Sequence, residues 1–145
     1  MARDGREKTK LAMTYTFMIA LTVFLVIDAV WLTTLGRGYY VAEIGSLLKA
    51  SPNLPVAALF YAVFIAGLLH FVIHPALLED SLRKAIVGGA FFGLVCYATY
   101  DLTNLATLKG FTWRIALIDI AWGTFLTATV AASSVAIVRL LQIKL

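Results

Sequence analysis

The stretch from Ala85 to Leu108, AIVGGAFFGLVCYATYDLTNLATL, is a continuous run of small and apolar residues that carries a single charge, Asp101. It is longer than the roughly 20 residues with which an α-helix crosses about 30 Å of hydrocarbon. Three further runs have the same character, at 11–35, 55–78 and 115–138. The sequence therefore predicts an all-α integral membrane protein in which four transmembrane helices form one domain of 145 residues.

The composition excludes the main alternatives. Hydrophobic residues make up 61% of the chain, charged residues make up 14%, and the mean hydropathy is +0.90. A water-soluble domain carries about 25% charged residues, and a membrane β-barrel shows short alternating segments instead of long apolar ones. The basic residues before the first run resemble the start of a signal peptide, but the run is too long and lacks a cleavage site of small residues. We expect it to remain as the first helix.

Basic residues predict the orientation of the chain in the membrane. The two ends and the second connection together carry eight lysines and arginines, and the other two connections carry four. The positive-inside bias then places both termini in the cytoplasm. A basic rim against anionic lipid explains the net charge of +4, so we expect the lipid bilayer and no nucleic acid as a partner. The eight are Arg3, Arg6, Lys8, Lys10, Arg83, Lys84, Arg139 and Lys144, and the four are Arg37, Lys49, Lys109 and Arg114.

The first outer connection, from Gly36 to Pro55, is the longest of the three. Its part YYVAEIGSLLKA fits a short amphipathic helix that lies along the membrane interface, anchored by Tyr39 and Tyr40 and ended before Pro52. A plain tether accounts for it equally well. The other two connections are short, which predicts that the helices they join are antiparallel neighbours.

Two glycines in the third helix, Gly89 and Gly93, form a small-xxx-small pattern that lets another helix approach closely. The approaching helix could belong to the same bundle or to a second copy of the chain. A homodimer is a reasonable expectation, because four helices of this length enclose little volume. We interpret the single cysteine, Cys96, as a packing residue.

Three acids lie within the apolar runs: Asp28, Asp101 and Asp119. A charged residue at the centre of a membrane span costs about 2.5–3.5 kcal/mol on insertion scales and is by default a candidate for function. Counted from the outer ends of their helices at 1.5 Å per residue, all three lie roughly 9 to 12 Å below the outer edge of the hydrocarbon. The sequence thus predicts one layer of carboxylates contributed by three helices.

Polar and aromatic neighbours extend this layer. Tyr97 and Asn104 lie on the same helical face as Asp101. The segments IDAVW and IDIAW repeat a pattern that puts a tryptophan three residues after the acid, at Trp31 and Trp122. Five residues are too few to establish an inverted repeat of the kind that transporters use.

Carboxylates this close together cannot all remain ionised in a low dielectric, so at least one should hold a proton or the group should hold a cation. Tyrosine and asparagine could orient a ligand, and the tryptophans could stack on a cationic or apolar group. A structural role is the alternative, in which the acids accept hydrogen bonds across helices and bind nothing. The predicted ligand-binding residues are Asp28, Asp101, Asp119, Tyr97, Asn104, Trp31, Trp122 and Tyr61.

The two histidines, His70 and His74, have a spacing that can hold a metal on one helical face. They lie in the inner part of the second helix, and Tyr61 is about 180° around that helix from His70 at 100° per residue. We therefore predict no metal site, and we interpret both as interfacial polar residues before Pro75. No phosphate-binding loop, nucleophile elbow, HExxH or CxxC occurs in the sequence, so no cofactor is expected and the catalytic residues of any enzyme stay unknown.

The segments FLVIDAVWL, PNLPVAALFYAVFIAGLLHFVIHPAL, YATYDLTNLATLKG and IDIAWG together resemble the bacterial membrane proteins grouped as domain of unknown function 2177. The resemblance covers nearly the whole chain and implies a small four-helix protein of the bacterial inner membrane, without implying a reaction. The chain departs from the family pattern around Leu54 and from Phe111 to Trp113, both in the outer connections. The family pattern falls on Asp28, Trp31, Phe60, Tyr61, Pro75, Tyr97, Tyr100, Asp101, Thr103, Asn104, Lys109, Asp119, Trp122 and Gly123.

These observations favour proton-linked binding or transport of a small cation, an amine or a lipid headgroup in an outward-facing acidic pocket. An enzyme or enzyme subunit that acts on membrane lipid is the competing hypothesis, with Asp101 as acid or base and Tyr97 or Tyr100 assisting. A structural subunit of a membrane complex is a third. A transporter predicts uptake that is lost in Asp101→Asn, whereas an enzyme predicts an altered lipid profile when the protein is deleted.

Overall fold

The computed structural model describes residues 2–143, with side chains from Gly5 onward, so Lys144 and the side chain of Arg3 lie outside the described part. Within that part the chain is helical and has no strand, which confirms the predicted all-α class. Four helical segments are long and apolar enough to cross a membrane: Gly5–Thr33, Leu54–Leu78, Leu82–Thr107 and Trp113–Leu140. The elements are α1 (Ala2–Thr33), α2 (Leu35–Ile44), the short 3₁₀-helix η1 (Gly45–Leu47), α3 (Leu54–Leu68), the π-helical turn η2 (Leu69–Ile73), α4 (His74–Leu78), α5 (Leu82–Thr107) and α6 (Trp113–Leu140).

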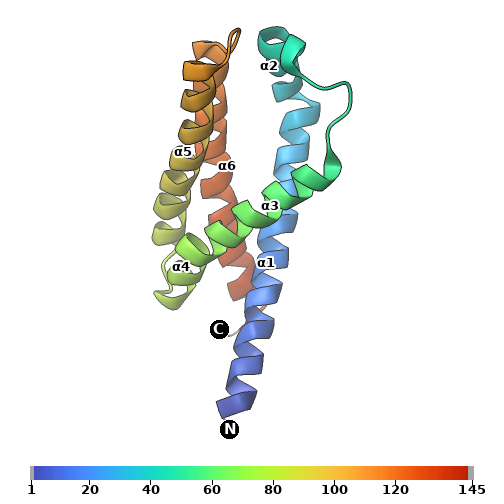
Figure 1. Ribbon diagram of the computed structural model, residues 1–145. Helices are drawn as coiled ribbons and strands as arrows, with labels where there is room; N and C mark the ends of the chain where they lie inside the picture. The colour runs from blue at the N-terminus through green and yellow to red at the C-terminus, as the bar shows by residue number, and fades with distance from the viewer. Residues whose placement is uncertain (1, 144–145) are drawn as a thin grey trace.

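The long helices alternate in direction, and α3 crosses the others obliquely (Figure 1). Helices α5 and α6 lie side by side as an antiparallel pair, and the two chain ends lie at the same end of the bundle. We call the opposite end, which holds α2, η1 and the connection 108–112, the α2 end. The side of the membrane on which each end lies stays a prediction from the basic residues.

The contact between α5 and α6 is close because two glycines of α5 face α6. A Cβ atom added at Gly89 would lie 2.8 Å from the backbone oxygen of Thr127 and 2.9 Å from Cβ of Ala131. A Cβ atom at Gly93 would lie 2.7 Å from Cβ of Thr127. The small-xxx-small pattern therefore serves a contact inside the bundle, where absent side chains let the two backbones touch.

The second span is interrupted near Pro75. Proline has no backbone N–H, and its ring crowds the carbonyl four residues earlier, so a regular α-helix cannot pass through it. The chain responds with the π-helical turn at Leu69–Ile73, and a new helix begins at His74. His70 is exposed and lies edge-on to the ring of Phe71, with the centroids 4.8 Å apart. Among the described residues, no group of three His, Cys, Asp or Glu side chains is placed to hold a metal ion.

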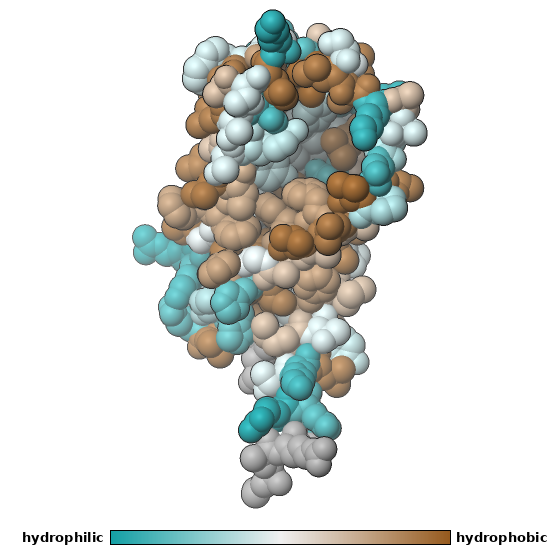
Figure 2. Space-filling view, viewed as in Figure 1, coloured by the Kyte–Doolittle hydropathy of each residue, from teal (hydrophilic) through white to brown (hydrophobic). Residues whose placement is uncertain are grey.

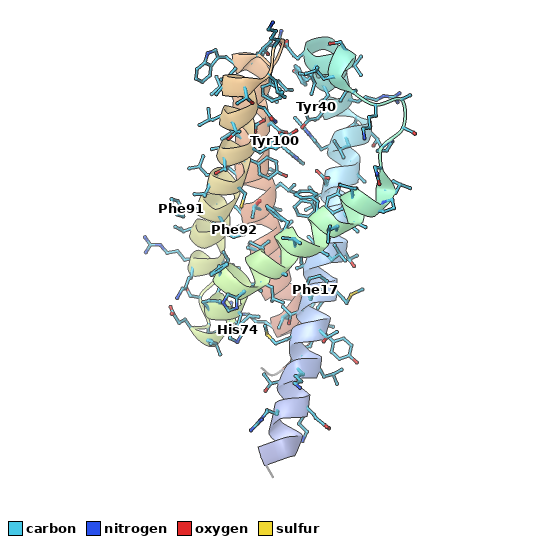
Figure 3. All side chains as sticks on the ribbon, in the orientation of Figure 1. Phe17, Tyr40, His74, Phe91, Phe92 and Tyr100 are labelled. Atoms are coloured by element: carbon cyan, nitrogen blue, oxygen red, sulfur yellow. The ribbon has the colours of Figure 1, made fainter. Side chains whose placement is uncertain are left out.

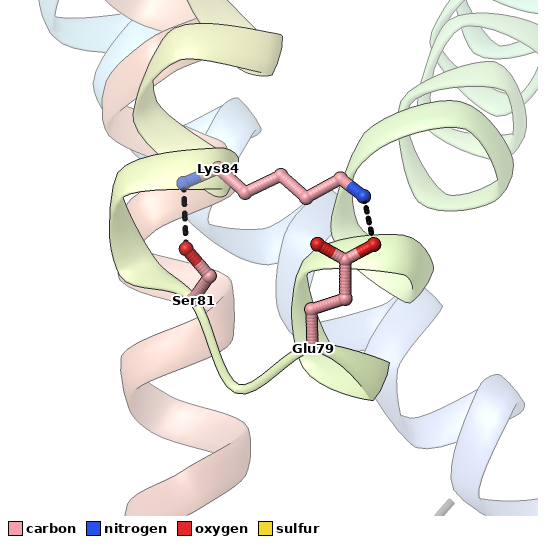
Figure 4. Close-up of polar contacts among 3 residues, drawn as sticks. All are labelled: Glu79, Ser81 and Lys84. Carbon is pink, nitrogen blue, oxygen red and sulfur yellow. Dashed lines mark hydrogen bonds and ion pairs between the residues drawn. The ribbon is translucent and has the colours of Figure 1, made fainter.

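The turn between α4 and α5 is held by polar contacts at the surface (Figure 4). The Ser81 hydroxyl accepts a hydrogen bond from the backbone N–H of Lys84 at 3.2 Å and so caps α5. The ammonium of Lys84 pairs with Glu79. Asp80 adopts a left-handed backbone conformation, with φ of 47°, and pairs with Arg139 of α6 at 2.7 Å.

The first connection contains a helix, α2, which overlaps the first half of the segment 39–50 proposed from the sequence but begins at Leu35 and ends at Ile44. The turn into α2 is tight because Gly36 lies against the indole of Trp31, where an added Cβ would be 2.8 Å from Cε2. Glu43 ties α2 to the start of α6, since it accepts a hydrogen bond from Thr112 at 2.6 Å and pairs with Arg114 at 3.4 Å. Helix α2 is thus folded over the bundle, and its predicted place at a membrane interface remains a prediction.

Buried apolar side chains from several helices form the core, among them Phe24 of α1, Ile65 of α3 and Leu126 of α6. The surface is apolar along its middle and becomes hydrophilic toward its ends (Figure 2). Many large apolar side chains on the outside are exposed, such as Phe91 of α5 at 67%. Such a surface fits a chain whose outer face meets lipid instead of water.

Candidate functional site

A cavity of about 400 Å³ lies among α1, α3, α5 and α6 toward the α2 end. We call it the aromatic cavity, because seven aromatic rings belong to its wall. Two of the predicted acids, Asp28 and Asp119, also belong to it. Its lining is Asp28, Leu32, Tyr40, Phe60, Tyr61, Phe64, Cys96, Tyr97, Tyr100, Asp119 and Trp122.

Asp28 is held by the second span. The Tyr61 hydroxyl of α3 donates a hydrogen bond of 2.9 Å to Oδ2 of Asp28, whose side chain is 8% exposed. The indole N–H of Trp122 is buried and lies close to the same carboxylate, but it makes no hydrogen bond of good geometry with any described group. The oblique crossing of α3 places Tyr61 against α1 and so gives this acid its partner.

Asp119 is held by α2. The Tyr40 hydroxyl donates to Oδ1 of Asp119 and accepts a hydrogen bond of 3.3 Å from the indole nitrogen of Trp31. Burial, together with the negative charge of Asp119, raises the pKa of Tyr40 above its usual value. The hydroxyl therefore stays protonated through the neutral range and remains a donor to the carboxylate.

The two tryptophans of the repeated sequence pattern meet face to face. The rings of Trp31 and Trp122 are stacked, with centroids 4.3 Å apart and planes 10° from parallel. Because α1 and α6 run in opposite directions, Trp31 lies nearer the α2 end than Asp28, and Trp122 lies farther from it than Asp119. Each side chain tilts toward the N-terminus of its own helix, so the two indoles converge between these levels. Trp122 also lines the aromatic cavity.

A second cavity, of about 660 Å³, lies beneath α2 and η1. We call it the α2 cavity. It includes Asp101 and Asp119 at one part of its wall and the basic residues Arg37 and Lys49 at another. Its lining is Leu32, Arg37, Tyr40, Val41, Ile44, Gly45, Leu48, Lys49, Ala50, Tyr100, Asp101, Phe111, Ile115 and Asp119.

Asp101 differs from the other two acids. Its side chain is 0% exposed, and neither carboxylate oxygen has a hydrogen-bond partner among the described groups. It forms part of the wall of the α2 cavity. A buried carboxyl group without a partner is costly whether it is ionised or neutral, because both forms leave polar atoms unsatisfied.

The two cavities share one boundary, formed by Leu32, Tyr40, Tyr100 and Asp119. In the view with side chains, Tyr40 of α2 and Tyr100 of α5 lie at the same level, where α2 faces α5 (Figure 3). The three acids are five to six residues from the helix ends at the α2 end, about 8 to 9 Å along the axes. They thus occupy similar depths, but the structure divides them between two cavities that have Asp119 in common.

The remaining predicted residues take different places. Tyr97 lines the aromatic cavity, and its ring lies so close to Gly123 that no Cβ would fit there. Trp31 contacts the site through Trp122 and Tyr40. Asn104 is half-buried and lines neither cavity.

Several residues of the site were not predicted to belong to it. Tyr40 was expected only as an interfacial anchor, and Arg37 and Lys49 only as markers of orientation. The hydrogen bond from Tyr40 joins residues 79 positions apart, and no periodicity relates residues that far apart. Gly36 was the one available signal, because a glycine so close to Trp31 permits the tight return of α2 over the bundle.

The family is settled by comparison with known proteins. Residues 13–136 match the model of a family described as predicted membrane protein, DUF2177, and the chain belongs to this family. Comparison with curated proteins and with solved structures finds no match.

Proposed function

We propose that this member of the family binds a small organic ammonium ion in the aromatic cavity and exchanges it for a proton. The observation that carries the proposal is the joint presence, in one cavity of about 400 Å³, of two carboxylates and seven aromatic rings. A volume of this size lies within the range of about 300–1,000 Å³ that is typical of small-molecule sites.

The chemistry of the wall favours a cation with an apolar body. The faces of Trp, Tyr and Phe attract an ammonium group within about 6 Å of the ring centroid, most strongly when it is desolvated. Asp28 and Asp119 each keep one oxygen outside their tyrosine hydrogen bonds, Oδ1 and Oδ2 respectively. These oxygens could accept hydrogen bonds from a primary or secondary ammonium, while Phe60 and Phe64 contact its hydrocarbon part.

Proton exchange follows from the position of the two acids on one apolar cavity. Two negative charges facing the same low-dielectric space are unfavourable, so the empty site would hold at least one proton. An entering ammonium ion would take over the role of that proton and release it. Binding would therefore grow stronger as the pH rises, until the amine itself loses its charge.

The test is proton release from the purified full chain in detergent, followed with a weakly buffered pH indicator during titration with benzylamine, ethylamine and sodium ions. We expect release with the amines that is lost in Asp28→Asn. Asp80→Asn is the matched control, because Asp80 is an exposed acid between α4 and α5, at the opposite end of the bundle. Absence of release with every cation, or equal release from wild type and Asp28→Asn, would overturn the proposal.

A more specific form of the same proposal is that the protein transports the ammonium ion across the membrane. Proteoliposomes that contain the chain should accumulate benzylamine when a pH gradient is imposed, and Asp28→Asn should abolish this uptake. Binding without uptake would reduce the function to a binding protein. An altered lipid profile in cells that lack the protein, restored by wild type and not by Asp101→Asn, would instead favour the enzyme hypothesis.

A further inference from the structure

The α2 cavity is lined by acidic and basic side chains that form no ion pair with one another. Asp101 and Asp119 belong to its wall within the bundle, and Arg37 and Lys49 belong to its wall on the α2 side. Among the described side chains, neither Arg37 nor Lys49 forms an ion pair, although Arg114 and Arg139 at the surface do. Side chains of opposite charge thus line one space of about 660 Å³ without an ion pair between them.

Asp101 is the residue of this cavity whose polar atoms are left unsatisfied by the described part of the protein. It is fully buried and both its oxygens lack a partner, so bulk water does not satisfy it in this conformation. It lies six residues before the end of α5, about 9 Å below that end. Its neighbour Tyr100 is 60% exposed and lines the cavity as well. A small rotation of the acid into the cavity would bring it to a ligand, and such rotamer changes are common on binding.

The two basic residues lie near the ends of the neighbouring spans. Arg37 follows the end of the first span at Thr33, and Lys49 precedes the second span at Leu54. These are the levels at which lipid phosphates and the aqueous phase meet a membrane protein. Both side chains are exposed and long enough to reach down toward the cavity.

We propose that the α2 cavity is a second binding site, for a zwitterion that carries a phosphate at one end and a primary ammonium at the other. The phosphate is held by Arg37 and Lys49, and the ammonium is held by Asp101 with Asp119 beside it. Phosphoethanolamine groups have this chemistry, whether they belong to a lipid or to a soluble molecule.

The unpartnered oxygens of Asp101 decide which ammonium fits. A primary ammonium offers three N–H donors, whereas the quaternary ammonium of choline offers none. Both groups carry the same charge, so a purely electrostatic site would accept either. A site whose acid lacks hydrogen bonds should prefer the primary ammonium.

The proposal goes beyond the amine site of the aromatic cavity and fails separately from it. The two sites share Leu32, Tyr40, Tyr100 and Asp119. Asp28 belongs only to the first, and Asp101, Arg37 and Lys49 belong only to the second. Benzylamine tests the first site, and glycerophosphoethanolamine tests the second. A negative result with one probe leaves the result with the other intact.

The experiment is calorimetric titration of the purified full chain with glycerophosphoethanolamine, glycerophosphocholine, ethanolamine and glycerol phosphate. We expect glycerophosphoethanolamine to bind about tenfold or more tightly than each of the other three, because only it offers N–H donors to the acid end and a phosphate to the basic end. Equal affinity for the ethanolamine and choline compounds would overturn the role of Asp101. No detectable binding of glycerophosphoethanolamine, together with no effect of the corresponding lipid, would overturn the site.

Substitutions test which residues hold the ammonium end and the phosphate end of the ligand. Asp101→Asn and Arg37→Gln should each weaken glycerophosphoethanolamine binding about tenfold or more. Arg37 is exposed, so its variant keeps the fold even if Asp101→Asn does not, and thermal unfolding checks both. Lys109→Gln is the matched control, because Lys109 is an exposed basic residue at the same end that lines neither cavity. An equal loss in Lys109→Gln would show a diffuse charge effect and contradict the site.

A lipid arm identifies the source of the zwitterion. The chain is placed in nanodiscs of phosphatidylcholine, with or without phosphatidylethanolamine, and titrated again with glycerophosphoethanolamine. Weaker binding in the presence of phosphatidylethanolamine would show that the lipid headgroup occupies the site. Unchanged binding would assign the site to a soluble phosphoethanolamine compound.

Discussion

Two regions of the helical bundle differ in how closely their helices approach one another. At Gly89 and Gly93, α5 and α6 touch backbone to backbone, beside the buried apolar side chains of the core. Toward the α2 end, the oblique path of α3 and the return of α2 leave two cavities, and the three acids Asp28, Asp101 and Asp119 lie there.

The difference shows how a small membrane protein accommodates buried charge. Helices that pack through glycines have no room for a polar ligand, and the fit is fixed by backbone atoms. Helices that diverge leave space that side chains of several elements can line. The closely packed part can then fix the relative positions of the helices, and the divergent part can bind a ligand. Four sets of substitutions would break or sharpen this contrast.

The largest effect is expected where the helices touch. Gly93→Ala places a methyl group against Thr127 and the α6 backbone, so α5 and α6 must separate. We expect a loss of about 1–3 kcal/mol or more in the free energy of unfolding, measured by denaturant titration in mixed micelles. Gly38→Ala is the control, because an added Cβ at Gly38 meets nothing within 4 Å. Equal effects at the two sites would contradict close backbone packing.

The next effect separates two acids of the divergent end. Asp28 accepts a hydrogen bond from Tyr61, whereas Asp101 has no partner. Asp101→Leu should leave the stability unchanged or raise it by about 1–3 kcal/mol, because an unpaired buried polar group disappears. Asp28→Leu should lower it by about 1–3 kcal/mol, because the Tyr61 hydroxyl loses its acceptor. Thermal unfolding compares the two, and destabilisation by Asp101→Leu would show that Asp101 has a partner in solution.

A smaller, local effect is expected at α2. Tyr40→Phe removes the donor to Asp119 and the acceptor for Trp31 at once. We expect α2 to open more readily, by about 1–2 kcal/mol, seen as faster amide hydrogen exchange in α2 with little change in α5 and α6. Tyr39→Phe is the control, because it keeps the ring that lies under Arg114, with the guanidinium carbon 5.8 Å from its centroid. Faster exchange throughout the bundle would contradict a local role for Tyr40.

The smallest effects belong to the turn between α4 and α5. Ser81→Ala removes the helix cap and should cost about 1 kcal/mol. Lys84→Gln removes an exposed ion pair with Glu79 and should change the stability by about 0.5 kcal/mol or less. Denaturant titration of both variants tests the order, and a larger loss in Lys84→Gln would reverse it.

Much of the fold follows from local properties of each segment that can be read from the sequence. Runs of apolar residues longer than a membrane is thick specify four spans, and the predicted bounds agree with the structure to within a few residues for all but the start of α1. The glycine pair at 89 and 93 marked a close helix contact, but only the structure placed that contact on α6. The π-helical turn was not predicted, although Pro75 stood in the sequence as its cause.

The depths of the three acids along their helices could be predicted from the sequence, but their hydrogen-bond partners could not. A fixed rise per residue puts Asp28, Asp101 and Asp119 at similar depths wherever the helices lie. Which side chains meet each acid depends on how far each helix is rotated and tilted, and on where the connections return. The oblique path of α3 brings Tyr61 to Asp28, and the return of α2 brings Tyr40 to Asp119.

The sequence by itself thus determined the class of protein, the number of spans and the level of the three acids, because hydropathy, length and helical rise are properties of each segment alone. Only the tertiary structure decided that Asp28 and Asp101 line different cavities, that Asp119 borders both, and that Arg37 and Lys49 line the same cavity as Asp101. The physical reason is that burial and hydrogen bonding are shared between segments, and their geometry is fixed only when α2 and α3 pack against α1, α5 and α6.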